Sequence, residues 1–166
     1  MRLSARIALI GTTLAVAGFG ALLVYGPERV WERFVPIDLG PVDFASLQRS
    51  VSPNDALAAT PGTVPVGLPI DTVLPIYARS VQELLNAIDE RAANDGARIV
   101  ASGANMRRYV TYSPTLRFPD TTVVEAVRLD VGTGVRAYAR ASLGYADMGA
   151  NQKRLERWLG TLERSK

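Results

Sequence analysis

An uncharged stretch of nineteen residues, 7–25, lies near the start of a chain of 166 residues and limits what this part can become. At about 1.5 Å per residue, a helix of that length reaches roughly 28 Å, close to the thickness of a bilayer's hydrocarbon core. Inside it, the hydroxyls of Thr12 and Thr13 can bond backward to helix carbonyls, so no polar group need be unpaired in lipid. The stretch Ile7 to Tyr25 therefore predicts a transmembrane helix, with the lipid bilayer as its partner.

A cleavable signal peptide is the alternative, because residues 1–6 are basic and residues 15–17 (Ala-Val-Ala) have the small-x-small pattern of a cleavage site. The apolar run continues through residues 19–25, which favours an anchor that stays on the mature protein. We expect residues 1–6 in the cytoplasm and residues 26–41 as a juxtamembrane linker. The predicted location is the inner (cytoplasmic) membrane, crossed once, with the C-terminal domain in the periplasm.

The sequence contains no cysteine and no histidine. Catalysis by Ser-His-Asp or Cys-His groups, zinc sites built on these residues and disulfide bonds are therefore excluded. The sequence also has no glycine-rich phosphate loop and no dinucleotide-binding fingerprint. We expect no cofactor and no metal ion, and assign no catalytic residue.

The charge balance bears on nucleic-acid binding. From residue 26 onward, 17 basic and 16 acidic side chains nearly cancel, because Arg2 and Arg6 account for the other two of the 19 basic residues. A polyanion-binding protein is expected to be more basic. The basic and aromatic residues 107–109 are expected on an exposed strand edge, where charge discourages aggregation. No nucleic-acid partner is predicted.

Seven of the ten prolines lie between residues 36 and 75. A brief helix over 28–34 is expected to stop at Pro36, and the chain after it should be extended or turning. One short helix is predicted over residues 42–49 and a first strand over residues 73–77. Because this stretch is too apolar for a free linker, we expect it to lie over the folded domain.

A capping box marks the start of the next helix. The hydroxyl of Ser80 can accept a hydrogen bond from the amide of Glu83, and the carboxylate of Glu83 can accept one from the amide of Ser80. Apolar side chains then recur at helical spacing as far as Gly96. Further strands and a final helix follow. They are expected over residues 98–101, 107–113, 122–130 and 135–143 for the strands and 149–163 for the helix.

The last two strands predict a hairpin, because Gly132-Thr133 suits a two-residue type II′ turn with glycine first. In that register Glu125 lies opposite Arg140, so that opposite charges meet. Alanines of the last strand share one face and leave room for the final helix. The sequence predicts an α+β fold: one N-terminal transmembrane helix followed by an antiparallel β-sheet with helices packed on one face.

Three segments carry a resemblance to a known family. They are Ser-Pro-Asn-Asp-Ala-Leu at 52–57, Phe-Pro-Asp at 118–120 and Gly-Tyr-Ala-Asp-Met-Gly-Ala-Asn-Gln-Lys-Arg at 144–154. Together they resemble the signature of domain-of-unknown-function family 1499, over roughly Val42 to Leu162, and we assign the domain to 42–164. The resemblance implies a small, often envelope-associated bacterial or plastid domain without an established activity.

This sequence departs from the family's pattern at several positions. Many relatives carry cysteine where Asp55 stands, so a thiol-based role is excluded here. Others carry serine or arginine at the positions of Ala139, Ala141 and Ser142. The resemblance therefore leaves the chemistry of the domain open.

The polar residues around the last motif have two interpretations. In the structural interpretation, Asp147 or Asn151 accepts hydrogen bonds from free amides at the start of the final helix. In the functional one, a polar pocket suited to a phosphate or carboxylate is lined by two strand residues and three residues of the motif. The candidate ligand-binding residues are Tyr138, Arg140, Asp147, Asn151 and Arg154.

Three classes of function follow from these features, the third being a structural subunit whose only task is assembly. The first is a non-enzymatic binding or interaction module at the membrane surface, whose partner is a membrane protein, a lipid or an anionic small molecule. The second is a carboxylate-dependent envelope hydrolase or lyase that uses Asp120 and Asp147, since paired carboxylates can act as acid and base when burial separates their pKa values. The distance between these two side chains distinguishes the first two classes.

Overall fold

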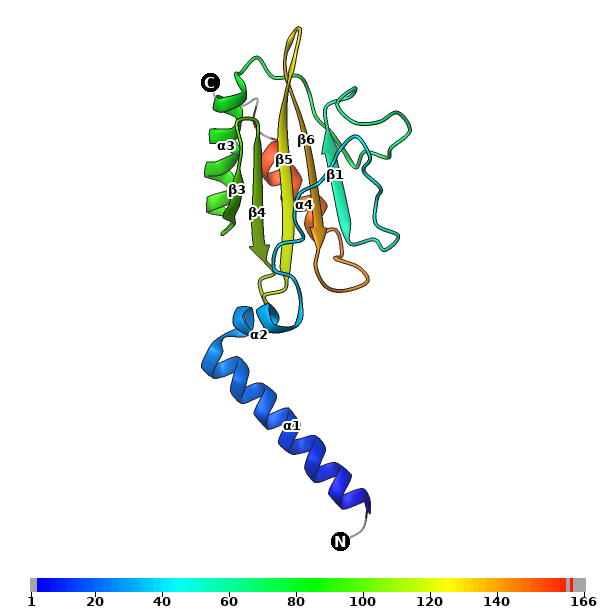
Figure 1. Ribbon diagram of the computed structural model, residues 1–166, viewed down its shortest axis with the longest axis vertical. Coiled ribbons are helices and arrows are strands. Elements are labelled where there is room, and N and C mark those ends of the chain that lie inside the picture. Colours follow the sequence, from blue (N-terminus) through cyan, green and yellow to red (C-terminus); the bar gives the residue numbers. More distant parts are fainter. Residues whose placement is uncertain (1–2, 161, 163–166) are drawn as a thin grey trace.

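The computed structural model describes residues 3–160 and 162, with the backbone alone for residues 3–5, 8, 21–23 and 25. Two helices come first: α1 (Leu3–Tyr25) and α2 (Pro27–Phe34). They are separated by Gly26, which has a φ of 77°. α1 points away from the rest of the molecule, while α2 lies at one end of it (Figure 1). The predicted brief helix over 28–34 is thus confirmed.

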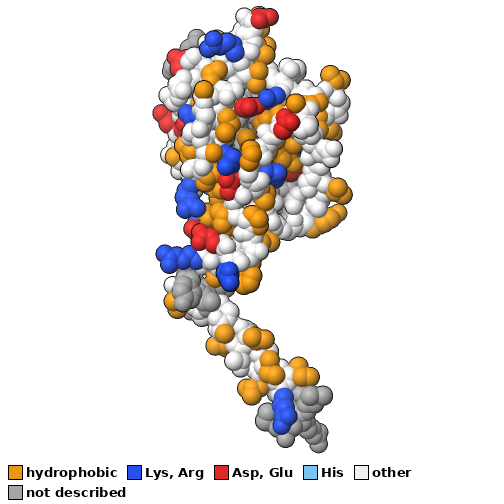
Figure 2. Space-filling view, in the orientation of Figure 1, with side chains coloured by type: hydrophobic (Ala, Val, Ile, Leu, Met, Phe, Trp, Pro, Cys, Tyr) orange, Lys and Arg blue, Asp and Glu red, His pale blue; other side chains and the backbone are white. Residues whose placement is uncertain are grey.

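The helix predicted over residues 7–25 is present, but its role as a membrane span stays a prediction. Among the described residues, no helix combines the length and the apolar character needed to cross a membrane. The side chains of α1 that the structure describes are nearly all exposed, including the apolar Ile7, Leu14 and Phe19. Figure 2 shows apolar side chains on a helix that stands clear of the domain.

The domain is built on a six-stranded sheet with the strand order β2-β1-β6-β5-β4-β3. All neighbours pair antiparallel except β1 and β2, which are parallel. Two helices, α3 (Val81–Asn94) and α4 (Ala150–Leu159), pack on one face (Figure 1). The predicted α+β fold with helices on one face is therefore confirmed. The strands are β1 (Asp55–Ala59), β2 (Thr72–Val73), β3 (Arg98–Ser102), β4 (Met106–Tyr112), β5 (Pro119–Leu129) and β6 (Gly132–Ala141).

The small side chains of the central strands let α4 approach the sheet closely. Ala137 and Ala139 of β6 are fully buried, and so are two alanines of β1 beside them. They form one apolar cluster with Leu155 and Trp158 of α4. The predicted place of the final helix over the alanine face is confirmed, because a small residue on a strand leaves volume that a large helix side chain fills.

The opposite face of the sheet is covered by irregular chain. Phe44 is buried there with Leu57 of β1 and Tyr138 of β6, and several apolar side chains of residues 42–70 pack against them. The proline-rich stretch therefore lies over the domain, as predicted. It contains β1 and β2, but no helix over 42–49, so that prediction was wrong.

The capping box that begins α3 is confirmed. The hydroxyl of Ser80 accepts a hydrogen bond from the amide of Glu83 at 3.3 Å. The Glu83 carboxylate accepts from the amide of Ser80 at 2.8 Å. Two amides at the helix start are thereby satisfied, as the capping box requires.

The hairpin of β5 and β6 is present, but the predicted register was wrong by four residues. Glu125 pairs with Arg136 instead of Arg140, and the turn consists of residues 130–131. Gly132 is needed for another reason: its φ is 146°, and a Cβ there would lie 2.6 Å from the carbonyl oxygen of Tyr77. Because a shift by an even number keeps every side chain on its face, the alanine face was still assigned correctly.

Residues 107–109 were predicted at a strand edge and lie in β4 instead, which has β3 on one side and β5 on the other. Arg107 forms an ion pair with Asp89 of α3 at 3.1 Å. Tyr109 is buried and donates its hydroxyl to the same carboxylate at 2.6 Å. These residues therefore attach α3 to the sheet.

Candidate functional site

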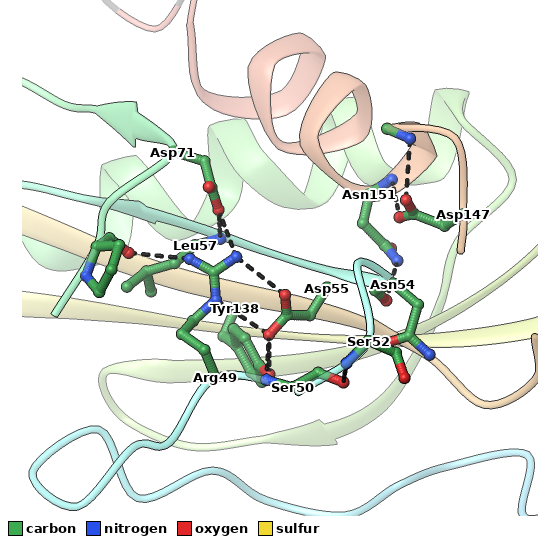
Figure 3. Close-up of polar contacts among 12 residues, drawn as sticks. Arg49, Ser50, Ser52, Asn54, Asp55, Leu57, Asp71, Tyr138, Asp147 and Asn151 are labelled. Carbon is green, nitrogen blue, oxygen red and sulfur yellow. Dashed lines mark hydrogen bonds and ion pairs between the residues drawn. The ribbon is translucent and has the colours of Figure 1, made fainter. Parts of the chain in front are cut away.

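The three segments that carry the family resemblance meet at one end of the sheet. The carbonyl of Asn54 accepts from the side-chain amide of Asn151 at 3.1 Å, and the side-chain amide of Asn54 donates to the carbonyl of Gly144 at 2.9 Å. The amide of Ser142 donates to the carbonyl of Pro119 at 3.0 Å. Strand β1 places the first segment beside the loop that leads from β6 into α4 (Figure 3).

Beneath the start of α4 lies a group that we call the Asp120 network: Asp120, Arg154 and Asn151. Arg154 donates to the Asp120 carboxylate at 2.8 Å, and each of the two side chains is only 7% exposed. The second terminal nitrogen of Arg154 donates to the side-chain oxygen of Asn151. Burial raises the pKa of Asp120, the positive charge of Arg154 opposes this, and the negative charge of Asp147 adds to it.

Asp147 satisfies the first amides of α4. One carboxylate oxygen accepts from the amide of Gly149 and the other from the amide of Asn151, both at 2.9 Å. Gly149 has a φ of 75°, a conformation that glycine adopts without strain. This geometry agrees with the structural interpretation of Asp147, because a carboxylate at a helix start is stabilised by free amides and by the helix dipole.

On the other face of the sheet lies a second group, the Asp55 network: Arg49, Asp55, Asp71 and Tyr138 (Figure 3). The guanidinium of Arg49 donates to both oxygens of Asp55, at 2.9 and 3.0 Å, and reaches Asp71 at 2.8 Å. The hydroxyl of Tyr138 donates to Asp55 at 2.5 Å. The amide of Ser50 donates to the same carboxylate at 2.8 Å.

The donors around Asp55 decide its charge state. Burial alone raises the pKa of this carboxyl, but the hydrogen bonds from Arg49, Tyr138 and the Ser50 amide outweigh it and hold the pKa below its ordinary value. Burial and the neighbouring Asp55 charge raise the pKa of Tyr138, so that its hydroxyl stays a donor. From the sequence, Asp55 was noted only as a departure from the family's pattern, and Arg49 was not singled out.

The five predicted site residues do not form one pocket. The structure brings Asp147, Asn151 and Arg154 together on the helix side, whereas Tyr138 and Arg140 lie on the opposite side of β6. Successive side chains of a strand point to opposite faces, so residues 138 and 140 cannot share a face with the alanines under α4.

Arg140 has its own structural contacts. Its guanidinium donates to the carbonyls of Leu39 and Gly40, at 2.6 and 3.1 Å. The amide of Leu39 in turn donates to the hydroxyl of Thr121 on β5 at 2.9 Å. These bonds fasten the covering segment across the sheet; ligand binding by the five residues stays a prediction.

A hollow of about 360 Å³ opens beside the start of α4. Lys153, Arg154 and Arg157 line it together with the acidic Asp95 and Asp147, so the charges of its walls largely balance. Arg157 is itself paired with Asp95 at 2.7 Å. Within the described part of the chain, no three acidic side chains are grouped so that they could hold a metal ion. The hollow therefore combines nearly balanced charges with the apolar side chains of Pro114, Met148 and Ala150.

These features define an α+β domain whose polar networks join its connecting segments to the sheet. The family model for a protein of unknown function (DUF1499) matches residues 47–162. The chain belongs to this family, as the resemblance of its three segments indicated. Neither the curated proteins nor the solved structures give a match.

Proposed function

We propose that the protein is held in the inner (cytoplasmic) membrane by α1 and that its domain is a non-enzymatic binding module on the periplasmic side. The observation that carries this proposal is the surface of α1. Its described side chains include Ile7, Leu9, Ile10, Leu14, Val16 and Phe19, all of them at least 59% exposed. A soluble protein rarely leaves so continuous an apolar surface in water. The hydrocarbon core of a bilayer would cover this apolar surface and remove it from water.

The binding role is supported by the state of the domain's charged groups. Asp55 is surrounded by donors, Asp147 accepts two amides, and Asp120 is enclosed with Arg154. A general acid or base must reach the proton that it transfers. These carboxylates are instead engaged within the domain, which favours binding by the surface over catalysis in a pocket.

Alkaline extraction of membranes that contain the full chain tests the anchor. We expect the protein in the membrane pellet. The double substitution Leu14→Arg with Val16→Arg should move it to the supernatant, because each arginine costs about 3 kcal/mol at the centre of a span. Val131→Arg, on an exposed turn of the domain, is the matched control and should stay in the pellet. Unsubstituted protein in the supernatant would overturn the proposal.

The absence of cysteine allows a direct test of orientation. A cysteine introduced as Val131→Cys should react with a membrane-impermeant maleimide in spheroplasts without lysis. Reaction only after lysis would place the domain in the cytoplasm.

The binding role is tested by isolating the tagged full chain from gently solubilised membranes, and recovery of no protein or lipid above background would contradict it.

An envelope hydrolase or lyase is the second candidate, and one observation favours it: the raised pKa of the buried Asp120, with Asp147 among its causes. A raised pKa is typical of a general acid. The test is hydrolysis of envelope-derived ester, amide and glycoside substrates by the purified full chain. Activity that Asp120→Asn abolishes, in a protein that stays folded, would support this candidate, and no activity on any of them would reject it.

A further inference from the structure

Four large apolar side chains are exposed at the end of the domain from which α1 leaves. They belong to three separate segments: the end of α2, the loop between β4 and β5, and the loop between β6 and α4 (Figure 1). We call them the anchor-side residues. They are Phe34, Leu116, Tyr145 and Met148, which are 74%, 54%, 77% and 92% exposed.

Side-chain contacts fix α2 to the first of these loops. The indole nitrogen of Trp31 donates to the carbonyl of Leu116 at 2.7 Å, and its ring lies 4.8 Å from the ring of Phe118. Arg117 donates to the carboxylate of Glu28 at 2.9 Å. The place where α1 joins the domain is therefore set by the loop that carries Leu116.

The second loop lies next to the first. Met148 lines the hollow beside α4 together with Tyr112, the last residue of β4, and Pro114, which lies in the turn from β4 to β5. Both loops thus border one hollow, and α2 is attached to one of them. The anchor-side residues are consequently parts of one end surface, although they come from distant positions in the sequence.

The fold itself gives no reason for apolar side chains at the tip of the second loop. Met148 has a φ of 54°, a conformation that non-glycine residues adopt at some cost. Its side chain buries almost nothing in return. A single exposed apolar residue needs no explanation. Several of them gathered at the end that carries an apolar helix indicate a surface to be covered.

We infer that the anchor-side residues contact the interfacial layer of the same bilayer that holds α1, so that the domain rests on the membrane by this end. The inference depends on the proposed anchoring. Tyrosine favours this layer because its ring is apolar and its hydroxyl remains hydrated. The exposed cations Arg29 and Arg33 lie in α2, and the exposed Lys153 lies in the first turn of α4, where it lines the hollow with Met148; their long stems can reach lipid headgroups.

The test uses the full chain reconstituted into phosphatidylcholine vesicles, with single cysteines introduced by Leu116→Cys, Tyr145→Cys or Met148→Cys. Each cysteine carries a polarity-sensitive fluorophore, and the vesicles contain lipids with a nitroxide near the headgroup. Val131→Cys is the matched control, because Val131 is 77% exposed on the turn at the opposite end of β5 and β6. We expect blue-shifted emission and at least about twofold stronger quenching at the three test positions than at the control.

Three outcomes would overturn the inference, and they are distinguishable. Vesicles that fail to retain the protein would show that the anchoring itself is wrong. Retained protein with equal, weak quenching at all four positions would show an anchored domain that stands away from the bilayer. A blue shift without lipid quenching would show that a protein surface, such as a second copy of the chain, covers this end instead.

Discussion

The two faces of the sheet each bury a carboxylate beside an arginine, but they treat its charge in opposite ways. On the loop-covered face, Asp55 receives donors from Arg49, Tyr138 and a backbone amide, and its pKa is lowered. On the helix face, Asp120 has Arg154 as its charged partner and its pKa is raised, burial being the main cause. Asp55 has more donors, whereas Asp120 is more strongly desolvated and lies near the negative charge of Asp147, so an arginine partner alone does not decide which form is favoured.

This difference teaches where the domain depends on an ionised group. A carboxylate held by several donors stabilises the fold only while it is charged. Where the desolvation of a buried carboxylate outweighs the attraction of its ion pair, the fold loses little stability when the group becomes neutral. The comparison is open to test because both groups can be replaced by asparagine, which keeps the shape and removes the charge. The stabilities below refer to the full chain in mild detergent, with unfolding followed by the fluorescence of its two tryptophans, of which Trp158 is buried in the core.

Asp55→Asn is expected to have the largest effect, a loss of about 3 kcal/mol in the free energy of unfolding. The new side-chain NH₂ group would face groups that are themselves donors. Arg49 would also lose its ion pair with residue 55. Urea titration measures the loss. An effect no larger than that of Asp120→Asn would break the comparison between the two faces.

Tyr138→Phe should cost about 2 kcal/mol, because it removes one hydrogen bond to a charged carboxylate without changing the ring that packs beside Leu57. The double variant with Asp55→Asn provides a cycle. If the two residues act through this bond, the double variant loses less than the sum of the single variants. Strict additivity would contradict a direct interaction.

Acid should weaken the fold through Asp55. Its pKa is lower in the folded than in the unfolded chain, so its stabilising contribution is complete above the unfolded value of 3.8 and is lost as the pH falls through the folded value. As the pH falls from about 5 to about 2, the urea midpoint of the unsubstituted protein should therefore fall more steeply than that of Asp55→Asn. Parallel pH profiles would show that other groups carry the acid sensitivity.

Asp120→Asn should cost only about 1 kcal/mol, since asparagine can still accept from Arg154 and the buried carboxylate already disfavours its charged form. The sign of its pH dependence is opposite to that of Asp55. The folded chain holds the Asp120 proton to a higher pH, so this group's contribution is present below 3.8 and is lost as the pH rises through the folded value. A large cost for Asp120→Asn would show that the charged pair is essential.

Arg157→Gln is expected to change stability by less than about 0.5 kcal/mol, the smallest effect of the series. Its ion pair with Asp95 has good geometry, but the arginine side chain is 55% exposed. Water and salt therefore screen the interaction. The same urea titration provides the measurement. A loss comparable to that of Tyr138→Phe would show that exposure does not distinguish weak surface ion pairs from the stronger buried ones.

The features that sequence predicted well are local. The capping box at Ser80 and the alternation of the β6 side chains between the two faces depend on neighbours within a few positions, and both are confirmed. Strand β1 was missed because its residues 55–59, Asp-Ala-Leu-Ala-Ala, have little intrinsic preference for a strand. Its place between β6 and β2 comes from tertiary packing. The Asp55 network could not be predicted without that strand.

The division of the candidate site was predictable in part. The alternation of β6 had already assigned its alanines to the face under the final helix, which places Tyr138 and Arg140 on the other face. The partners of Arg140 could not be foreseen, because they are carbonyls about 100 residues earlier in an irregular segment. Such contacts leave no periodic signal in the sequence.

The attachment of α2 has a mechanical consequence. Glu28 and Trp31 hold residues 116–118, and this loop leads directly into β5. Tension along α1 would thus be transmitted sideways into the middle of the sheet, in parallel with the covalent path through residue 35. The contacts of Glu28 and Trp31 with residues 116–118 therefore carry part of the load. The covering segment would otherwise bear all of it.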